Sequence, residues 1–293
     1  MANPDHLALL KSGAVRWIEW RRKNPDIEPD MSVANLRGIN LRGGSFSKAN
    51  FRGADLCNSV LIRANLNGAN FSTTNLSGAM LVEASLIEAN LSIANLKGAN
   101  LRDAELKAAI LIGTDLRKTN LINVNFEDAN LMGADLREAN LRGADLSAAK
   151  LIQTNFREAN LIEAHLSLAD LSNANLSCAQ IMGAYLYKAE LNKANLSEAH
   201  LGKCFIFNTN LSEANLMRAD LSWTNLSKAN LTYANLSKAN LRGANLSKAN
   251  FTDANLSESN LRGANLHRAN LRGANLHKAN LEGATMPDGT NHH

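Results

Sequence analysis

The stretch from Leu226 to Asn280 reads LSKAN LTYAN LSKAN LRGAN LSKAN FTDAN LSESN LRGAN LHRAN LRGAN LHKAN, and it decides the fold. Every fifth residue is Leu or Phe, which we call the central residue. Asn precedes it by one residue (the Asn position), and Ala or Ser by two (the small position). The two residues after it vary, and we call them the first and second outward positions. This register continues without insertion from Met31 to Met286, 52 central positions in all, each Leu, Phe, Ile or Met.

A five-residue period fits neither an α-helix nor a flat strand. In a helix, five residues advance about 500°, so successive central residues step by roughly 140° and cover every face. In a flat strand, an odd period sends them to opposite faces. The chain must therefore turn by a fixed angle in each repeat, so that every central residue points to one axis. Four repeats per turn predict a square coil of about 20 residues and about 13 stacked coils.

These repeats resemble the pentapeptide repeat proteins, whose phrase A-(N/D)-L-x-x covers roughly 255 of the 293 residues. The resemblance implies an all-β fold, a right-handed quadrilateral parallel β-helix with β-bridges between coils and turns at the corners. The segments VRWIEWRRKNPDIEPDMSVANL (15–36) and GATMPDGTNHH (283–293) are similar to the termini of cyanobacterial members. We expect Ala at the small position to point inward. We expect Asn to form hydrogen bonds along the stack and to tolerate the dihedral angles of a tight turn.

Residues 1–30 lie outside the repeat and predict a short α-helical cap. Asn3, Pro4 and Asp5 resemble a helix start, and Ser12-Gly13 leaves one helix or two short helices open. The apolar residues of the cap are expected to pack on the first coil; they include Leu7, Leu10, Trp17, Ile18 and Trp20. We therefore predict a cap (1–30), a β-helix (31–286), and a C-terminal turn and tail (287–293).

Composition and charge argue against several classes of protein. The 31 basic and 27 acidic side chains give a net charge of +4 and are interspersed, which is typical of a solvated, ion-paired surface. No apolar run approaches the roughly 18 residues of a membrane span, and the first residues do not resemble a secretory signal. Three scattered cysteines suit a reducing compartment and give no metal-binding spacing. We expect a cytoplasmic protein without cofactor, metal or membrane contact.

Departures from the repeat gather on one wall. With a 20-residue coil, Tyr185 falls above Phe205 and Tyr187 above Phe207, and His165 precedes Tyr185 by one coil. Trp223 falls near the corner that leads into the same face. Because contiguous outward apolar residues often mark a partner surface, we take these six as the candidate partner-binding site: His165, Tyr185, Tyr187, Phe205, Phe207 and Trp223. The alternative is an aromatic ladder that only stabilises the stack.

The expected function is a non-catalytic, regulatory scaffold that binds another protein through its walls. An uninterrupted solenoid lacks a concave pocket with convergent groups, so we expect no enzymatic activity and no small-molecule substrate. Some family members bind DNA gyrase by imitating duplex DNA with a strongly acidic rod, which the positive net charge disfavours. Weak nucleic-acid binding through Arg and Lys stripes is a further alternative, opposed by neighbouring acids. An uncovered C-terminal coil gives a last hypothesis, a homodimer through that end.

Overall fold

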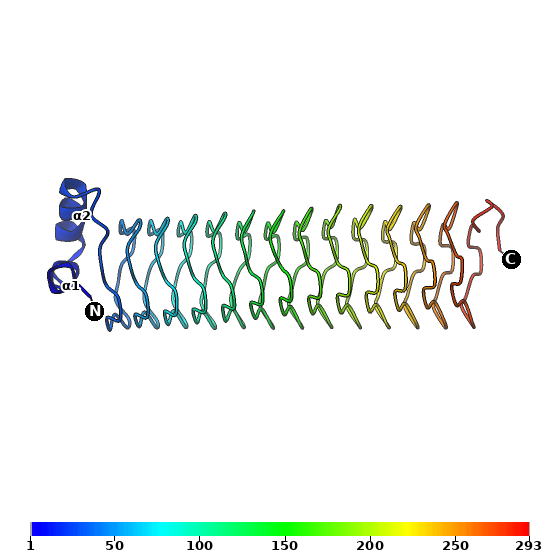
Figure 1. The fold of residues 1–293 in the computed structure, drawn as a ribbon, viewed down its shortest axis with the longest axis horizontal. Helices are drawn as coiled ribbons and strands as arrows, with labels where there is room; N and C mark the ends of the chain where they lie inside the picture. The colour runs from blue at the N-terminus through cyan, green and yellow to red at the C-terminus, as the bar shows by residue number, and fades with distance from the viewer. Residues whose placement is uncertain (1, 293) are drawn as a thin grey trace. The chain divides into compact units, whose positions relative to one another are not determined.

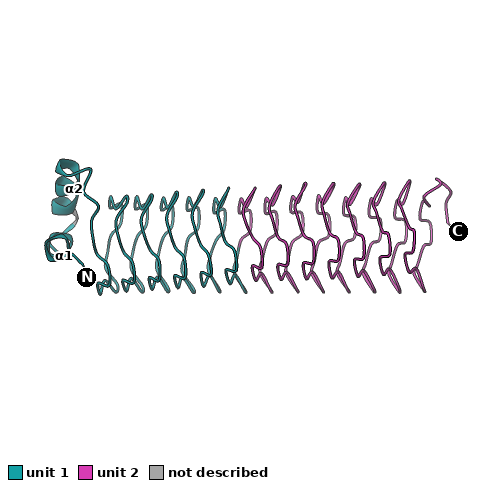
Figure 2. Ribbon diagram, viewed as in Figure 1, with its two compact units in different colours: residues 1–140 teal, residues 141–293 magenta. Residues whose placement is uncertain are grey.

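The computed structural model describes residues 2–292 and divides into two compact units, residues 1–140 and 141–293 (Figure 2). Unit 1 opens with two short helices, α1 (Pro4–Lys11) and α2 (Ala14–Lys23), labelled in Figure 1. Asn3 caps α1, because its side-chain oxygen accepts hydrogen bonds from the backbone N–H groups of Asp5 and His6. Gly13, with a φ of 108°, separates the helices. Of the two alternatives for the cap, two short helices form.

The cap supplies hydrogen-bond donors to the first coil. In later coils, backbone N–H groups of one coil donate to carbonyl groups of the next. At the first coil, the Trp17 indole N–H donates to the Ser45 carbonyl at 3.0 Å. The Arg21 guanidinium donates to the Ser47 carbonyl at 3.4 Å. Ser45 occupies an Asn position and Ser47 a first outward position, and in later coils the carbonyls at these two positions accept hydrogen bonds from the backbone N–H groups of the preceding coil. The helices therefore satisfy backbone groups that an open solenoid end leaves unpaired.

Packing of the cap is concentrated on Trp17, which is 1% exposed and stacks on the Phe46 ring at a centroid distance of 5.1 Å. Leu10 is also buried, and Trp20 contacts the Trp17 ring at 5.4 Å. Leu7 is partly buried. The expectation for Ile18 was wrong in extent, because its side chain is 50% exposed. Ile18 follows Trp17 by one residue, which turns it about 100° round the helix, so it lines a gap between cap and coil while half of its side chain stays exposed.

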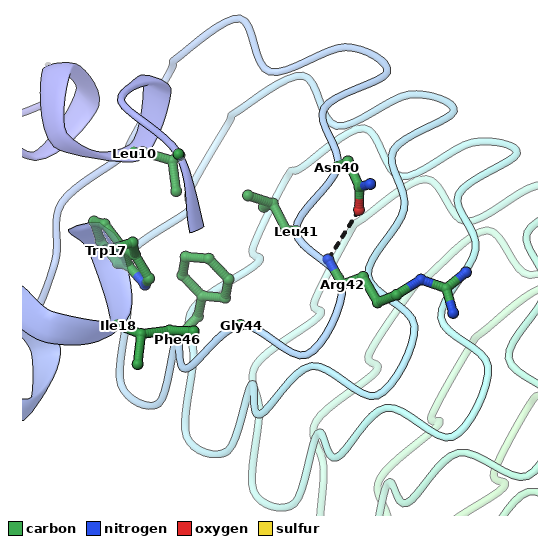
Figure 3. Close-up of a pocket in the computed structure, with 9 residues that line it drawn as sticks. Leu10, Trp17, Ile18, Asn40, Leu41, Arg42, Gly44 and Phe46 are labelled. Atoms are coloured by element: carbon green, nitrogen blue, oxygen red, sulfur yellow. Dashed lines mark hydrogen bonds between the residues drawn. The ribbon is translucent and has the colours of Figure 1, made fainter. Parts of the chain in front are cut away.

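A small gap of about 50 Å³ remains beneath the cap, lined by Leu10, Trp17, Leu41 and Phe46 (Figure 3). Leu10 and Trp17 come from the helices, and Leu41 and Phe46 from the first coil, as the close-up shows. A space of this size holds a few water molecules. We therefore read it as a packing gap between cap and coil.

The repeats form parallel β-bridges between residues 20 apart, one bridge in each repeat. In unit 1 these bridges run from Asp30↔Asn50 to Asn120↔Asn140, and in unit 2 from Asp145↔His165 to Asn265↔Thr285. The bridging residue occupies the Asn position. No strand longer than one bridge is assigned within residues 2–292, where β structure consists of these pairs and one antiparallel bridge, Thr285↔Asn291. Four repeats therefore make each coil, as the period predicts, while the total of about 13 coils stays a prediction.

Two hydrogen bonds in each repeat run forward to the next coil and one runs back. The central N–H donates to the carbonyl of the Asn position one coil on, as Leu186 does to Phe205 at 2.8 Å. The second outward N–H donates to a first outward carbonyl, as Leu168 does to Tyr187 at 2.9 Å. The N–H of the Asn position donates back to a small-position carbonyl, as Tyr185 does to Ala164 at 3.0 Å. These bonds fix the vertical register, so residues 20 apart lie in columns.

Central and small residues together fill the axis. Central side chains from Phe46 to Leu266 are at most 1% exposed, and Ala at the small position is almost equally buried. Four Thr residues at the small position donate their hydroxyl to the carbonyl of a central residue 23 positions earlier: Thr74, Thr114, Thr209 and Thr224. Cys204 donates its thiol to the Ile181 carbonyl in the same way. These five buried polar groups are thus paired with the preceding coil, whereas Thr119 and Ser259 donate to the central residue of their own turn.

A tight turn follows each central residue, closed by a hydrogen bond such as Ala54 N–H to Phe51 carbonyl at 2.9 Å. Its left-handed residue is at the second outward position, where even Ile93 has a φ of 58°. The expectation that Asn carries the tight-turn dihedral angles was therefore wrong. Asn instead accepts the N–H of the first outward residue, as Asn195 accepts from Ser197 at 3.1 Å. Its amide also bonds along the column, as the sequence predicts.

The parts 1–30, 31–286 and 287–293 stay a prediction. The helices and the first bridge at Asp30 agree with the first boundary. Near the other boundary, the Gly283 N–H donates to the His292 carbonyl at 2.8 Å, and the Met286 N–H donates to the Thr290 carbonyl at 2.7 Å. The residues from Pro287 to His292 therefore fold back along the last repeats.

Candidate functional site

The first column of the candidate site is a stack of three rings at the Asn position in unit 2. His165 and Tyr185 lie 5.0 Å apart between ring centroids, with 14° between their planes. Tyr185 and Phe205 lie 4.9 Å apart, with 7° between planes. These separations match the usual spacing of about 4.8 Å between neighbouring strands, so the backbone bridges set the stacking distance. Tyr185 and Phe205 each remain 42% exposed.

A second column stands beside the first at the first outward position. The rings of Tyr187 and Phe207 lie 4.5 Å apart and are tilted by 31°. Lys188 places its ammonium nitrogen 5.2 Å from the Tyr187 centroid, within cation–π range. Tyr187 is half-buried and Phe207 is 37% exposed. We call these five residues (His165, Tyr185, Phe205, Tyr187 and Phe207) the aromatic wall.

Trp223 is not part of this stack. It occupies a second outward position and is 60% exposed, and no ring contact joins it to the aromatic wall among the described residues. Its ring lies over Gly243, where an added Cβ would meet ring carbons at 2.5 Å. Trp223 thus packs along its own column at the corner, and its place in the partner-binding site stays a prediction.

Two features of this region were missed by the sequence analysis. Leu168 is 59% exposed and its N–H donates to the Tyr187 carbonyl, so it extends the exposed apolar surface by one position. The other feature is a solvent-open groove of about 320 Å³ next to Gly183 and Gly202. A signal for the groove was present in the sequence, because Gly202 is the one glycine at a first outward position between Met31 and Met286.

Several of the cationic side chains that stack in columns are held by acids. Arg117 pairs with Asp115 at 2.6 Å and approaches Asp135 at 3.7 Å, and Arg137 pairs with Asp135 at 2.6 Å. The Arg117 guanidinium holds the pKa of the Asp115 carboxyl below its usual range, chiefly through their hydrogen bond. Similar pairs join Arg63 to Glu83 in unit 1. The stripe at Arg117 and Arg137 is therefore largely neutralised.

Other chemistry is sparse in the part of the chain that the structure covers. Within residues 2–292, no group of three or more His, Cys, Asp or Glu side chains is arranged to hold a metal ion. Burial raises the pKa of the Cys204 thiol to about 12. The longer helix, α2, has 10 residues, and neither helix there has the length and apolarity to cross a bilayer.

The model of the family described as pentapeptide repeats matches residues 34–137 and 139–286 in overlapping copies. Among solved structures, HetL from the cyanobacterium Nostoc sp. strain PCC 7120 is 38% identical, covers 74% of this chain and 91% of its own, and has a TM-score of 0.31. HetL is described as a pentapeptide repeat protein involved in heterocyst differentiation regulation. None of the curated proteins matches the chain.

Two further structures share the repeat. Rfr23, a pentapeptide repeat protein from the cyanobacterium Cyanothece 51142, is 44% identical over 31% of this chain and 58% of its own, with a TM-score of 0.26. A trypsin-treated variant of QnrB1, a plasmid-mediated fluoroquinolone resistance protein, is 22% identical over 58% of this chain and 87% of its own, with a TM-score of 0.47.

Proposed function

Because this chain belongs to the pentapeptide repeat family, we propose that it is a non-catalytic scaffold that binds a protein partner through its aromatic wall. The observation that carries the proposal is the exposure of stacked rings at an Asn position and at the first outward position beside it. Tyr185 and Phe205 remain 42% exposed and Phe207 remains 37% exposed, although aromatic residues make up 5% of the chain. Large exposed aromatic side chains that a rigid backbone holds in place suit the centre of a protein–protein interface.

The rigidity of the wall supports this function. The rings of the first column stand on residues that are bridged to both neighbouring coils, as Tyr185 is to His165 and Phe205. The rings are also stacked on one another, so little rotamer entropy is left to lose on binding. Because stacked rings present their edges to solvent, the wall suits apolar and carbonyl groups of a protein better than the flat face of a sugar.

The alternatives receive less support from the same surface. A DNA mimic that binds gyrase needs a dense acidic rod, whereas this chain has a net charge of +4. A nucleic-acid strip needs uncompensated cations, whereas Arg117 and Arg137 are paired with acids. A supercoiling assay with excess protein and a gel shift at low salt address these alternatives. We expect neither gyrase inhibition nor retention of duplex DNA.

The test of the proposed function is a triple variant, Tyr185→Asn, Phe205→Asn and Phe207→Ser. Tagged wild-type and variant chains are used to capture proteins from an extract of the native host, and the bound proteins are identified by mass spectrometry. We expect at least one protein to be retained by the wild type and lost from the variant, while the β signal in circular dichroism is unchanged. Tyr233→Asn is the matched control, because Tyr233 is 65% exposed and lies outside the wall. Equal capture by the triple variant would refute the proposal.

A further inference from the structure

Gly202 is unusual because nothing in the fold requires glycine there. Glycines at the second outward position have positive φ, but Gly202 does not. A Cβ built at Gly202 would have its nearest neighbours, the Ser222 carbonyl and hydroxyl oxygens, at 3.7 Å, an ordinary contact distance. A side chain would therefore fit. Because Gly202 has no side chain, open space remains at this position, on the side of the coil that comes just before the aromatic wall in the chain.

That space is the groove of about 320 Å³ beside Gly202. Ile162 and Met182 form its apolar side, and Met182 is 45% exposed. Asp220 and Ser222 lie on the other side, and Glu163 and Lys203 stand at the corner. The volume is at the lower end for ligand sites, so it suits one inserted side chain better than a whole cofactor.

The groove and the aromatic wall flank the same edge of the solenoid. Gly183 precedes Tyr185 by two residues and Lys203 precedes Phe205 by two, with a buried small-position residue between them. At roughly 3.3 Å per residue, the corner lies within about 7 Å of backbone from the rings. An extended polypeptide that crosses this edge can contact both features at once.

The charges around the groove indicate what it binds. The Glu163 carboxylate is paired with Arg142 at 3.4 Å. Asp220 accepts hydrogen bonds from the Ser222 N–H at 3.1 Å and from the Asn240 side-chain amide at 2.9 Å. The charge of Glu163 is therefore compensated by a cation, whereas both of these donors to Asp220 are neutral.

Lys203 is the cation among the residues that line the groove, and it has no carboxylate partner among the described residues. The Lys203 ammonium is therefore available to pair with a carboxylate of the occupant. A carboxylate on the occupant would complement it, and an aliphatic side chain next to that carboxylate would fill the space beside Met182.

We propose that the groove at Gly202 is a subsite for an extended segment of the partner protein, which inserts one aliphatic side chain beside Met182 and pairs a neighbouring carboxylate with Lys203. This inference rests on the proposed function, since it assigns a sequence character to the partner. Backbone groups of the segment lie along the edge towards Tyr185 and Phe205.

The test uses random linear peptides displayed on phage as the probe. The wild-type chain is the target, and peptides that also bind the Gly202→Met chain are removed. We expect the enriched peptides to share an aliphatic residue next to Asp or Glu. Synthetic copies carrying a fluorophore should bind the Gly202→Met and Lys203→Glu chains at least tenfold more weakly by fluorescence anisotropy. Ser247→Met is the matched control, because it places the same side chain at a first outward position outside the groove and should leave affinity unchanged.

Several outcomes would overturn the inference. The first is that no peptide binds the wild type in preference to the Gly202→Met chain. The second is that the enriched peptides lack acidic residues. The third is that the peptides bind the wild-type and Gly202→Met chains with equal affinity. Self-association of the wild type that Gly202→Met abolishes in sedimentation velocity would make the occupant a second copy instead. Circular dichroism of each variant checks that the coil is intact.

Failure of the groove is distinguishable from failure of the aromatic wall. If a host protein binds the Gly202→Met chain but not the triple wall variant, the aromatic-wall proposal is supported and the groove proposal is refuted. If peptides show the expected loss on Gly202→Met while the triple variant captures every host protein normally, the groove stands and the wall proposal is wrong.

Discussion

Replacing Tyr185 and Phe205 by Asn, singly and together, separates binding from stability on the aromatic wall. Asn is the repeat's own residue at this position, and the parallel bridges run through the backbone, so the coil keeps its ladder. Each new Asn can accept the N–H two residues on, as Asn195 does from Ser197. What the variants lose is ring stacking at 4.9 Å and the area that it covers.

The magnitude follows from the exposed fraction. Each ring is 42% exposed, so on the order of 120 Å² of a side chain of about 200 Å² is covered. At about 25 cal/mol per Å², that area contributes about 3 kcal/mol. The Asn side chain covers part of the same area and regains a hydrogen bond of about 1 kcal/mol. We therefore expect a net loss of about 1–2 kcal/mol for each single variant.

The double variant should lose less than the sum of the two single losses, by the stacking energy of about 0.5–1.5 kcal/mol that the pair shares. Because a solenoid opens locally, the assay is hydrogen exchange followed by mass spectrometry on peptides covering residues 181–210, with 241–265 as internal control. The Leu186 amide, which donates to the Phe205 carbonyl, lies in the first region.

Two results would refute this reasoning. A loss above about 4 kcal/mol that spreads to residues 241–265 would show that the rings hold the stack together, so the wall would be structural first. Strict additivity of the single variants would show that the rings do not stabilise one another.

Three further predictions concern other parts of the chain. Trp17→Phe keeps the aromatic packing but removes the donor to the Ser45 carbonyl, so unfolding in urea should show a loss of about 1–2 kcal/mol; an unchanged midpoint would contradict the capping role. Burial raises the pKa of Cys204 from 9.0 to about 12, so the folded chain binds its thiol proton longer than the unfolded chain, and the free energy of unfolding falls between about pH 9 and 12. At pH 9 the two half-buried cysteines should react with iodoacetamide and Cys204 should not, as peptide mapping would reveal. Leu276 and its neighbours in the coil at 271–285 are less buried than earlier central residues, so this coil should pair with a second copy in light scattering, and a monomer at high concentration would refute this.

The architecture followed from the five-residue period because geometry leaves few solutions for it. A period that fits neither helix nor strand requires a turn in every repeat, and the bridges between residues 20 apart agree with four repeats per coil. The handedness came from the family resemblance alone. The site of the left-handed residue was misjudged because intrinsic preference points to Asn or Gly, whereas Ile93 and Thr73 hold positive φ. Hydrogen bonds to neighbouring coils impose that conformation on whatever residue stands there.

The sequence predicts those contacts of the candidate site that join residues of one column, 20 residues apart. Tyr185 and Phe205 stack because the register places them 20 residues apart. The ring of Trp223 could not be placed in this way, since a corner side chain can lie along its own column, as it does over Gly243. The groove was missed because it exists where Gly202 lacks a side chain. Large or charged residues are the usual signals of a site in a sequence, and a single glycine is not one of them.

In a periodic solenoid, each unusual residue can be compared with the residue that the repeat places at the same position in other coils. In unit 2, the column on the opposite wall, from Asn155 to Asn275, is joined by amide hydrogen bonds, as between Asn215 and Asn195 at 3.3 Å. Asn at Tyr185 and Phe205 would therefore supply the same structural support without exposing rings to water. Stability alone does not account for two exposed rings and a glycine that the backbone does not require, all within two neighbouring coils. The proposed contact with another protein would account for both departures.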